Sequence, residues 1–240
     1  MDAKVTIAKR VALELKDGAL VNLGIGLPTM IPQFLPPGIN VYLQTENGLV
    51  GMGPAPAPGM GSPSNVDAGG RLIGAIPGAA SIDSCVSFGL IRGGHLDLTV
   101  LGGLEVDEQG QLANWMIPGK MVPGMGGGMD LVTGAKRVIV AMTHSAKGAA
   151  KIVKKCALPI TSTRRVNLIV TEMAVIEPTA RGLVLREIAP GITKEQVIAA
   201  TSASLIISDN LIEMPVWEYG QTGHFQAPTQ ALPEMGGNPK

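Results

Sequence analysis

The run Val138-Ile139-Val140-Ala141-Met142 is apolar at every position. Short apolar, β-branched runs of this kind recur along the chain, with helix-compatible stretches between several of them. Strands that are apolar throughout, rather than alternating, are typical of a parallel sheet covered on both faces. The pattern therefore predicts an α/β fold with a layered, open, mostly parallel sheet and helices on both faces. The other predicted strands are residues 19–23, 41–43, 98–101, 166–171, 183–188 and 205–208.

Three stretches between these strands are predicted helices. Apolar residues recur at helical spacing over residues 5–15, which indicates an amphipathic helix with Gly18 where such a helix would stop. Residues 145–155 and 194–201 are the other two candidates, and the serine that begins the first of them would act as its cap. Pro28 is also well placed to begin a helix.

Length and composition predict one main domain, residues 1–214, followed by a tail of different character. A chain of 240 residues fits one large α/β domain. Residues 215–240 have no periodicity but carry aromatic side chains, which pure linkers lack. We expect this tail to be extended and to dock on another chain, although an unstructured terminus fits its composition equally well.

The balance of apolar and charged residues points to a protein partner and to small-molecule chemistry. Hydrophobic residues make up 45% of the chain and charged residues 16%, which leaves little polar surface to cover a large core. This imbalance indicates an obligate partner. Lys and Arg together number 19, as do Asp and Glu, so the usual electrostatic argument for nucleic acid or an anionic membrane is missing.

The cysteines and histidines form no metal or redox motif. Cys85 and Cys156 lie far apart and belong to no C-x-x-C pair, which favours a reduced, intracellular protein. His95, His144 and His224 have no ligand spacing, so a catalytic metal is not expected. The chain shows neither a secretory signal nor the ~20 uninterrupted apolar residues of a membrane span. We therefore expect a cytoplasmic protein.

The tripeptide Glu46-Asn47-Gly48 closes the strand-like run 41–45 and precedes a glycine- and proline-rich stretch. A carboxylate at the end of a buried strand, beside bare glycine backbone, is placed to act as a nucleophile on an acyl group. The alternative is a simple turn, because Asn-Gly favours a tight bend. The tripeptide alone leaves both interpretations open.

Two glycine loops could bind polar or anionic groups. The first, residues 23–29, is not a dinucleotide fingerprint, because Thr29 stands where the third glycine would be. Gly24 and Gly26 would still let backbone N–H groups face a ligand. The second, residues 118–130, is not a P-loop, but its glycine-rich turn could converge N–H groups into an oxyanion hole. A crowded turn that only glycine fits explains the second loop equally well.

Taken together, these motifs resemble the beta (B) subunit of the family I CoA-transferases. The resemblance runs in the family's order from Met1 to about Met214 and includes the loops, which composition alone could not reproduce. It implies the open-sheet fold of that family, which is NagB/RpiA-like. The matching segments are residues 23–29 (LGIGLPT), 43–54 (LQTENGLVGMGP), 91–103 (IRGGHLDLTVLGG), 112–132 (LANWMIPGKMVPGMGGGMDLV), 142–148 (MTHSAKG) and 155–161 (KCALPIT).

The resemblance implies ping-pong transfer of CoA through a covalent intermediate. Glu46 would attack the thioester of an acyl-CoA, such as succinyl-CoA or acetyl-CoA, and become a glutamyl-CoA thioester that a short 3-oxoacid such as acetoacetate then opens. Gly127, with Gly126, would supply the oxyanion hole. CoA is a substrate here, and no cofactor is expected. Asn47 and nearby backbone would hold the Glu46 carboxylate, and Arg71 could meet a phosphate. The residues expected to bind CoA or substrate are Gly24, Gly26, Asn47, Gly48, Gly69, Gly70 and Arg71.

The resemblance also implies a second polypeptide. Enzymes of the family have two related halves with the active site between them, and this chain carries only the half with the glutamate. We expect a CoA-transferase alpha (A) subunit as partner, in an α2β2 assembly. Two alternatives remain: an acyl-CoA hydrolase that uses the same glutamate with water as acceptor, and a non-catalytic regulatory subunit that has kept the fold.

Overall fold

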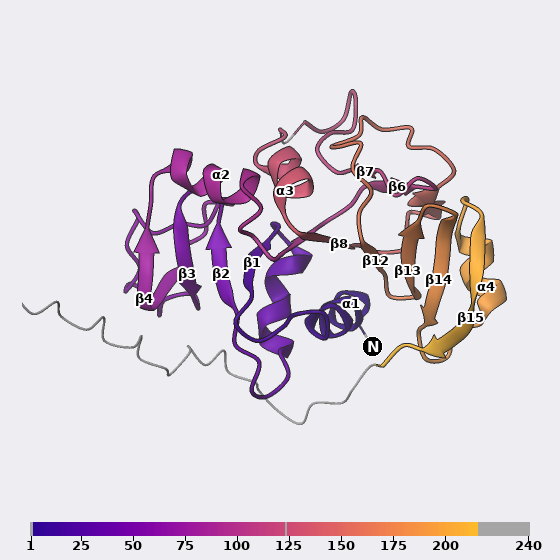
Figure 1. Ribbon diagram of the computed structural model, residues 1–240, viewed down its shortest axis with the longest axis horizontal. Helices are drawn as coiled ribbons and strands as arrows, with labels where there is room; N and C mark the ends of the chain where they lie inside the picture. Colours follow the sequence, from indigo (N-terminus) through magenta and orange to yellow (C-terminus); the bar gives the residue numbers. More distant parts are fainter. Residues whose placement is uncertain (1, 123, 216–240) are drawn as a thin grey trace, which may run out of the picture.

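Ten strands form one open sheet in the computed structural model, which describes residues 2–122 and 124–215. The strands are β1 (Leu20–Leu23), β2 (Tyr42–Thr45), β3 (Leu49–Gly53), β4 (Gly74–Ser81), β5 (Leu98–Leu101), β8 (Arg137–Ala141), β12 (Leu168–Val170), β13 (Ala174–Thr179), β14 (Gly182–Ile188) and β15 (Leu205–Glu213). Their order across the sheet is β15-β14-β13-β12-β8-β5-β1-β2-β3-β4 (Figure 1).

The centre of this sheet is parallel. Strands β12, β8, β5, β1 and β2 pair in parallel, and Val21 of β1 stands opposite Leu43 on one side and Leu98 on the other. Strands β3 and β4 are antiparallel additions at one edge. At the other edge β13 and β14 are antiparallel, and β15 runs parallel to β14. The prediction of an open, mostly parallel α/β sheet is confirmed.

Among the described residues, five helices flank the sheet: α1 (Ala3–Ala12), the 3₁₀-helix η1 (Leu27–Phe34), α2 (Ser84–Arg92), α3 (Gly128–Gly134) and α4 (Lys194–Ala200). Smaller strands complete the fold: β6 (Glu105–Asp107), β7 (Leu112–Ala113) and β11 (Ile152–Val153) form a three-stranded sheet, and β9 (Ser145–Ala146) and β10 (Ala149–Ala150) form a hairpin. The predicted helix 194–201 corresponds to α4, which Thr193 and Gln196 begin with a capping box.

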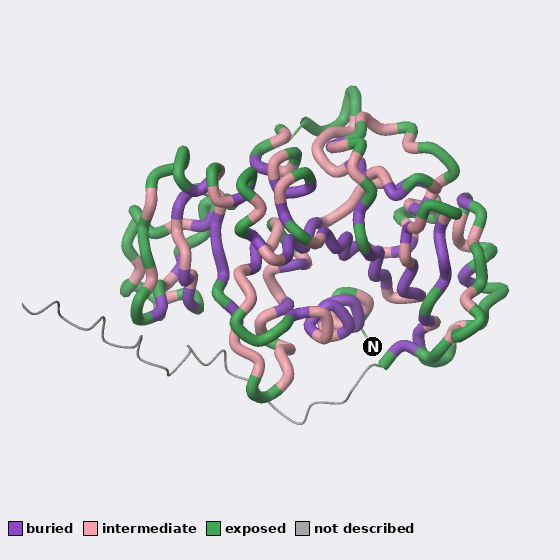
Figure 2. Tube along the Cα trace, viewed as in Figure 1, coloured by how far each residue is buried: buried purple, intermediate pink, exposed green. Residues whose placement is uncertain are grey.

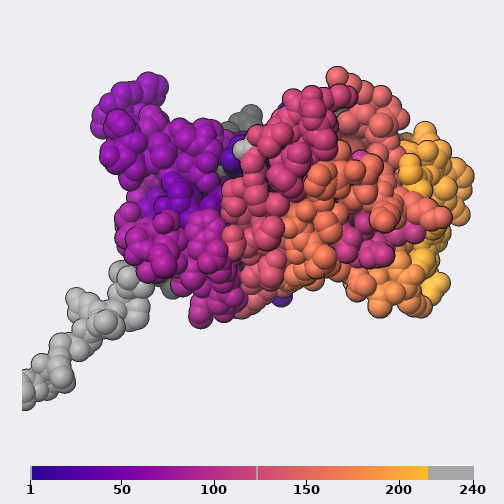
Figure 3. Space-filling view, turned by 90° about the horizontal axis from the view of Figure 1, so that it is seen from above, coloured from indigo at the N-terminus to yellow at the C-terminus, as the bar shows by residue number. Residues whose placement is uncertain are grey.

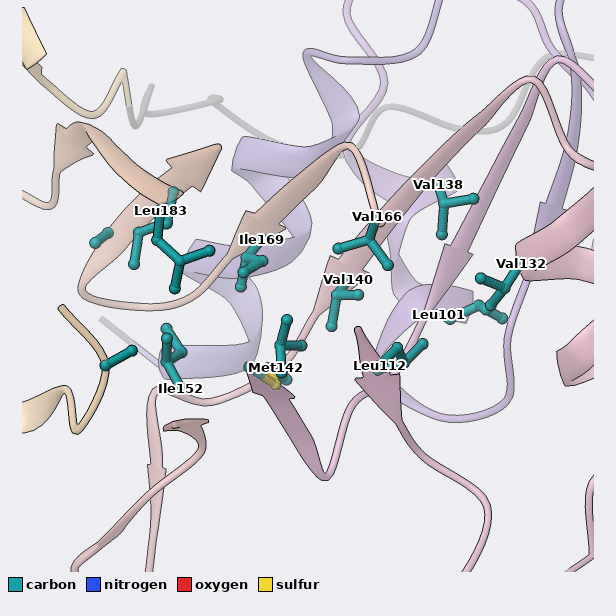
Figure 4. Close-up of a cluster of buried hydrophobic side chains, with 14 of the residues drawn as sticks. Leu101, Leu112, Val132, Val138, Val140, Met142, Ile152, Val166, Ile169 and Leu183 are labelled. Carbon is teal, nitrogen blue, oxygen red and sulfur yellow. The ribbon is translucent and has the colours of Figure 1, made fainter. Parts of the chain in front are cut away.

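The two faces of β8 belong to two separate hydrophobic clusters. Val138 and Val140 pack in one cluster with residues of α2, α3 and α4 (Figure 4). Ile139 and Ala141 pack in the other with residues of α1 and η1. Figure 1 shows α3 and α1 on opposite sides of β8, and Figure 2 shows buried residues along the central strands. Burial on both faces, at roughly 1.5–3 kcal/mol for each large side chain, explains the unbroken apolar run.

The predicted helix at 145–155 is wrong. Ser145 instead pairs with Ala150 in the β9–β10 hairpin, and β11 follows. Lys147 (φ 51°) and Gly148 (φ 80°) take left-handed conformations at the hairpin turn, which interrupt any right-handed helix. Ile152 is fully buried in the cluster of Figure 4, which fixes β11 against the sheet. Ser145 therefore caps no helix.

The first helix covers a different range from the predicted residues 5–15. Helix α1 ends at Ala12, and Gly18 adopts its positive φ (75°) in the following turn, where its N–H donates to the carbonyl of Asn40. At the other end, the buried Met214 donates its N–H to the carbonyl of Ile188. The predicted extended tail lies, apart from Pro215, outside the described residues. Within the described part of the chain, no helix has the length and apolar character that crossing a membrane requires.

Candidate active site

Glu46 occupies the turn between β2 and β3, at the carboxyl end of the parallel strand β2. Thr45 pairs with Leu49 across this hairpin, and the N–H of Gly48 donates to the carbonyl of Thr45 at 3.0 Å. Glu46 is half-buried and Asn47 is exposed. The tripeptide does form a tight turn, and this turn lies at the strand ends where open α/β sheets bind their ligands, so both interpretations of Glu46 remain open.

Gly48 fixes this turn against the segment before α2. Its φ is 125°, and an added Cβ atom would lie 2.2 Å from the carbonyl oxygen of Ile82. The N–H of Ile82 also donates to the carbonyl of Gly48 at 2.8 Å. Only glycine combines this φ with such a close approach of two backbone segments. The sequence Asn-Gly is thus required by packing as well as by the bend.

The hydrogen-bond donor to the Glu46 carboxylate is a residue that the sequence did not suggest. Nδ2 of Asn22, on β1, lies 3.1 Å from Oε2 of Glu46. Asn47, expected in this role, instead donates its side-chain amide to the carbonyl of Val66 at 2.8 Å. The expectation for the Asn47 side chain is wrong because it points to a loop rather than back to Glu46. A polar residue inside the apolar strand β1 was the signal that could have identified Asn22.

The glycine-rich turn before α3 contacts Glu46 directly. A Cβ atom at Gly127 would lie 3.1 Å from Cγ of Glu46 and 3.4 Å from the ring of Phe88. Gly124 and Gly126 have positive φ, 96° and 51°, which glycine adopts without strain. The turn is crowded at Gly127, as expected if only glycine fits there. Because the turn lies beside Glu46, it could also form the oxyanion hole.

The loop that contains Gly69 and Gly70 is organised around Asp67. The carboxylate of Asp67 accepts the N–H groups of Gly69 (2.9 Å) and Arg71 (3.0 Å) and pairs with the Arg71 guanidinium (2.7 Å). That guanidinium also donates to Oγ1 of Thr29 at 3.1 Å, which joins this loop to η1. The Arg71 side chain remains 51% exposed, so it can still meet a ligand from solvent.

Gly24 and Gly26 differ in what their backbones do. The N–H of Gly24 donates to the carbonyl of Val100 at 2.8 Å, and a Cβ atom there would press on Leu101 at 3.2 Å. The expectation that this N–H faces a ligand is therefore wrong, and close packing against β5 explains the glycine. Gly26 (φ 92°) accepts at its carbonyl from Thr29 and begins η1. The predicted helix start at Pro28 is confirmed to within one residue, as the 3₁₀-helix η1 that begins at Leu27.

Glu46, the loop around Asp67 and the segment 23–29 line one small cavity at the carboxyl ends of β1 and β2. Its lining includes Ile25, Thr29, Gln44, Glu46, Gly69 and Arg71. A second cavity of about 290 Å³ shares Thr29 and Arg71 with the first. Figure 3, which looks onto this end of the sheet, shows the surface hollowed between the purple residues before about 90 and the magenta residues after about 100. Among the described residues, no group of three or more His, Cys, Asp or Glu side chains could hold a metal ion.

Comparison with known proteins identifies the family. Residues 4–200 match the family model described as coenzyme A transferase. The chain belongs to the coenzyme A transferase family. It is 52% identical over 221 residues to the beta subunit of acetate CoA-transferase from Haemophilus influenzae, covering 92% of this chain and 99% of that protein. It is 47% identical to the B subunit of the probable succinyl-CoA:3-ketoacid coenzyme A transferase from Bacillus subtilis, covering 88% and 98%.

The fold of this CoA-transferase chain also matches solved structures. An acyl-CoA transferase from Escherichia coli O157:H7 superposes with a TM-score of 0.70 at 24% identity, over 89% of this chain and 43% of the longer one. The match to the fold supports the sheet order given above. The chemistry must come from the site itself, where a half-buried carboxylate, an amide donor and a glycine turn lie in contact.

Proposed function

We propose that this chain is the glutamate-bearing subunit of a CoA-transferase that moves CoA between an acyl-CoA and a short-chain 3-oxoacid such as acetoacetate. The names of the relatives, acetate CoA-transferase and succinyl-CoA:3-ketoacid coenzyme A transferase, support acetyl-CoA or succinyl-CoA as donor. The observation that supports the proposal is the close packing of Glu46 against the glycine turn, where a Cβ atom added at Gly127 would lie 3.1 Å from Cγ of Glu46.

Glu46 acts as the nucleophile in the first half-reaction and leaves as a free carboxylate in the second. Its carboxylate attacks the thioester carbonyl and displaces CoA thiolate, which leaves a mixed anhydride. The thiolate then attacks the glutamyl carbonyl to give a glutamyl-CoA thioester and the free acid, and the acceptor acid reverses these steps. Half-burial of Glu46 supports this role, because the anhydride and thioester both hydrolyse if water enters.

The turn before α3 stabilises the oxyanions that form. We assign Gly127 and Gly126 as the donors, because each tetrahedral intermediate places negative charge on an oxygen beside Glu46. One such donor is typically worth about 3 kcal/mol of transition-state stabilisation. The close packing of Gly127 against the Glu46 side chain supports this assignment.

CoA approaches along the loops that line the two cavities. Arg71, half exposed and already fixed by Asp67, is assigned to a phosphate of CoA. Gly69 lines the cavity at Glu46 and Gly70 follows it in the same loop. We assign Gly26, Asn47 and Gly48 to the binding site as neighbours in sequence of the cavity residues Ile25 and Glu46. Gly24 contributes by packing rather than by its N–H, which Val100 uses. The cavity of about 290 Å³ shares Thr29, Asp67 and Arg71 with the small cavity at Glu46 and gives room for part of the substrate.

The partner is an alpha (A) subunit, and we propose two copies of each polypeptide in the active enzyme. The relatives are named as beta or B subunits, which supports a separate partner chain. Apolar side chains stand exposed around the site, including Ile25 (64%), Val122 (64%) and Met129 (50%). An exposed apolar surface of this kind is typical of an interface. Residues 1–214 form the catalytic body, and the cytoplasm is the proposed location.

Mass spectrometry of the enzyme co-expressed with its partner tests this function. After incubation with an acyl-CoA, the peptide that contains Glu46 should carry a CoA adduct, and the adduct should be absent in Glu46→Gln. An adduct on any other residue would overturn the mechanism. Release of free CoA at full rate without an acceptor acid would replace transfer by hydrolysis.

A further inference from the structure

A network of buried polar side chains lies beneath Glu46, across β1, β2 and α2. Asn22, Gln44 and Ser87 are 1%, 2% and 0% exposed. Nδ2 of Asn22 lies 3.1 Å from Oε1 of Gln44, and Nε2 of Gln44 donates to Oγ of Ser87 at 2.8 Å. The Ser87 hydroxyl donates to the backbone carbonyl of Thr45 at 3.4 Å. Buried polar groups are costly unless paired, so this arrangement calls for a reason.

The direction of every hydrogen bond in this network is fixed. The carbonyl of Thr45 can only accept, so the Ser87 hydroxyl donates to it and must accept from Gln44. Gln44 then turns its Nε2 toward Ser87 and its Oε1 toward Asn22, which must present its NH₂ group. Nδ2 of Asn22 also lies 3.1 Å from Oε2 of Glu46 and 3.1 Å from the backbone carbonyl oxygen of Gln44. Asn22 can therefore donate to Glu46 but cannot accept from it.

The unpaired oxygen of the Asn22 amide indicates that this residue is needed for its NH₂ donor. Within the described part of the chain, Oδ1 of Asn22 is buried without a hydrogen-bond partner, while Nδ2 serves three acceptors. An unpaired buried oxygen costs roughly 1–3 kcal/mol. An apolar residue would avoid that cost on a strand that is otherwise apolar, so the side chain is explained by the group that it donates to.

We propose that Asn22 is a catalytic residue that stabilises the oxyanion on the glutamyl carbon itself. This inference rests on the proposed function. When CoA thiolate attacks Cδ of Glu46 in the mixed anhydride, the C=O electron pair moves onto Oε2. The pair then returns, the bond from Cδ to Oε1 breaks, and Oε1 leaves with the product carboxylate. Asn22 holds Oε2 throughout, and the same contact serves the reverse step with the acceptor acid.

The assignment adds Asn22 as a donor for the intermediate on Cδ of Glu46, beside the glycine turn already assigned to the oxyanions. In the other kind of intermediate the oxyanion forms on the substrate acyl carbon, which is bonded to the attacking oxygen of Glu46. The intermediate on Cδ of Glu46 lies against the sheet, where Asn22 comes from below and Gly127 contacts the side chain at Cγ. A donor that is already oriented by Gln44 and Ser87 needs no reorganisation during the reaction, which is the condition under which such groups contribute most.

Steady-state and single-turnover kinetics of the assembled enzyme test this role. In Asn22→Leu, kcat and the rate of glutamyl-CoA formation should fall by about 10²–10³-fold, while KM for the acyl-CoA stays near its wild-type value. In Asn22→Asp, a second carboxylate beside Glu46 should in addition move the acid limb of the kcat profile to higher pH. Replacement of Gln44 by Met should lower kcat by up to roughly tenfold, since Asn22 keeps its place but loses one acceptor.

The matched control is Thr99→Val. Thr99 stands opposite Asn22 in the sheet, is fully buried, and has an Oγ1 without a partner in the described chain, so this isosteric change should leave kcat unaltered. Full activity in Asn22→Leu, with a wild-type adduct on Glu46, would overturn the role of Asn22 and leave the proposed function standing. An absent adduct in the wild type would overturn the proposed function instead. Should both Asn22 variants fail to assemble, an unchanged kcat in Gln44→Met would refute the inference.

Discussion

Replacement of Gly48 by Ala should damage both stability and activity, and the structure gives the size of each effect. The added methyl carbon would lie 2.2 Å from the carbonyl oxygen of Ile82, so the turn must move by about 1 Å to relieve the overlap. A φ of 125° costs a non-glycine residue about 1–3 kcal/mol. Loss of the hydrogen bond from Ile82 to Gly48 adds about 1 kcal/mol. We expect destabilisation of roughly 2–4 kcal/mol.

The same movement displaces Glu46, two residues earlier in the turn. A shift of about 1 Å at a reacting group can lower the rate by about 100-fold. Urea unfolding of the purified protein measures the first effect, and kcat of the assembled enzyme measures the second. The carboxylate should still form the CoA adduct, but slowly, because its chemistry is intact and only its position has changed.

Gly38→Ala separates the collision from the backbone strain. Gly38 has a comparable positive φ of 81°, but a Cβ atom there would meet nothing within 4 Å. This variant should lose only the conformational part of the stability, about 1–2 kcal/mol, and keep the wild-type kcat. If Gly48→Ala matched Gly38→Ala in both unfolding free energy and kcat, the close approach of Ile82 would have no energetic consequence and the reasoning would fail.

Two further predictions concern the glycine turn and a buried histidine. Gly127→Ala should lower kcat about 10–100-fold, because its methyl group would press on Cγ of Glu46 at 3.1 Å and move the nucleophile; steady-state kinetics measures this. Burial lowers the pKa of His144 from 6.5 to about 4, between the hydroxyls of Thr171 and Thr201. Because only the unfolded chain is protonated in this range, stability is complete above pH 6.5 and falls by up to ~3 kcal/mol toward pH 4. In His144→Gln, urea unfolding should lose this part of the pH dependence.

Each of these predictions has a matched control. Gly128, next to Gly127, has no heavy atom within 3.4 Å of an added Cβ atom, so Gly128→Ala should cost less activity than Gly127→Ala. His95 is exposed, so His95→Gln should keep the slope of stability between pH 4 and 6.5. Equal losses in the two glycine variants, or equal slopes in the two histidine variants, would contradict the packing argument in each case.

Sequence patterns predicted best the strands that are buried on both faces of the sheet. Strand β5 was predicted with its observed bounds, and β8 to within one residue, because every position of each is apolar or closely packed. The predicted helix at 145–155 failed because periodicity cannot show that Lys147 and Gly148 turn the chain back. Positive φ at a lysine is a tertiary outcome, set here by the hairpin and by the burial of Ile152.

Patterns missed the elements whose residues have weak local preferences. Helix α2 contains Gly89 and buries little beyond Ser87 and Ile91, so its amphipathic signal is faint. Strand β4 carries Pro77 and Gly78, which are tolerated because it lies at the edge of the sheet. These elements form because their neighbours supply the packing. Local propensity could not have predicted either.

In the active site, too, local sequence patterns predicted one residue and missed another. Glu46 could be proposed from the sequence because a strand end, a turn and a glycine-rich stretch are contiguous in the chain. Asn22 lies 24 positions earlier and reaches Glu46 only because β1 and β2 are adjacent and parallel. The signal was nevertheless present: Asn22 is the one polar residue of β1, and it stands opposite the polar Gln44 of β2 in register. Since a buried amide is retained against its desolvation cost only where its hydrogen bonds are used, two such residues on adjacent parallel strands point to a functional group at the carboxyl ends of those strands.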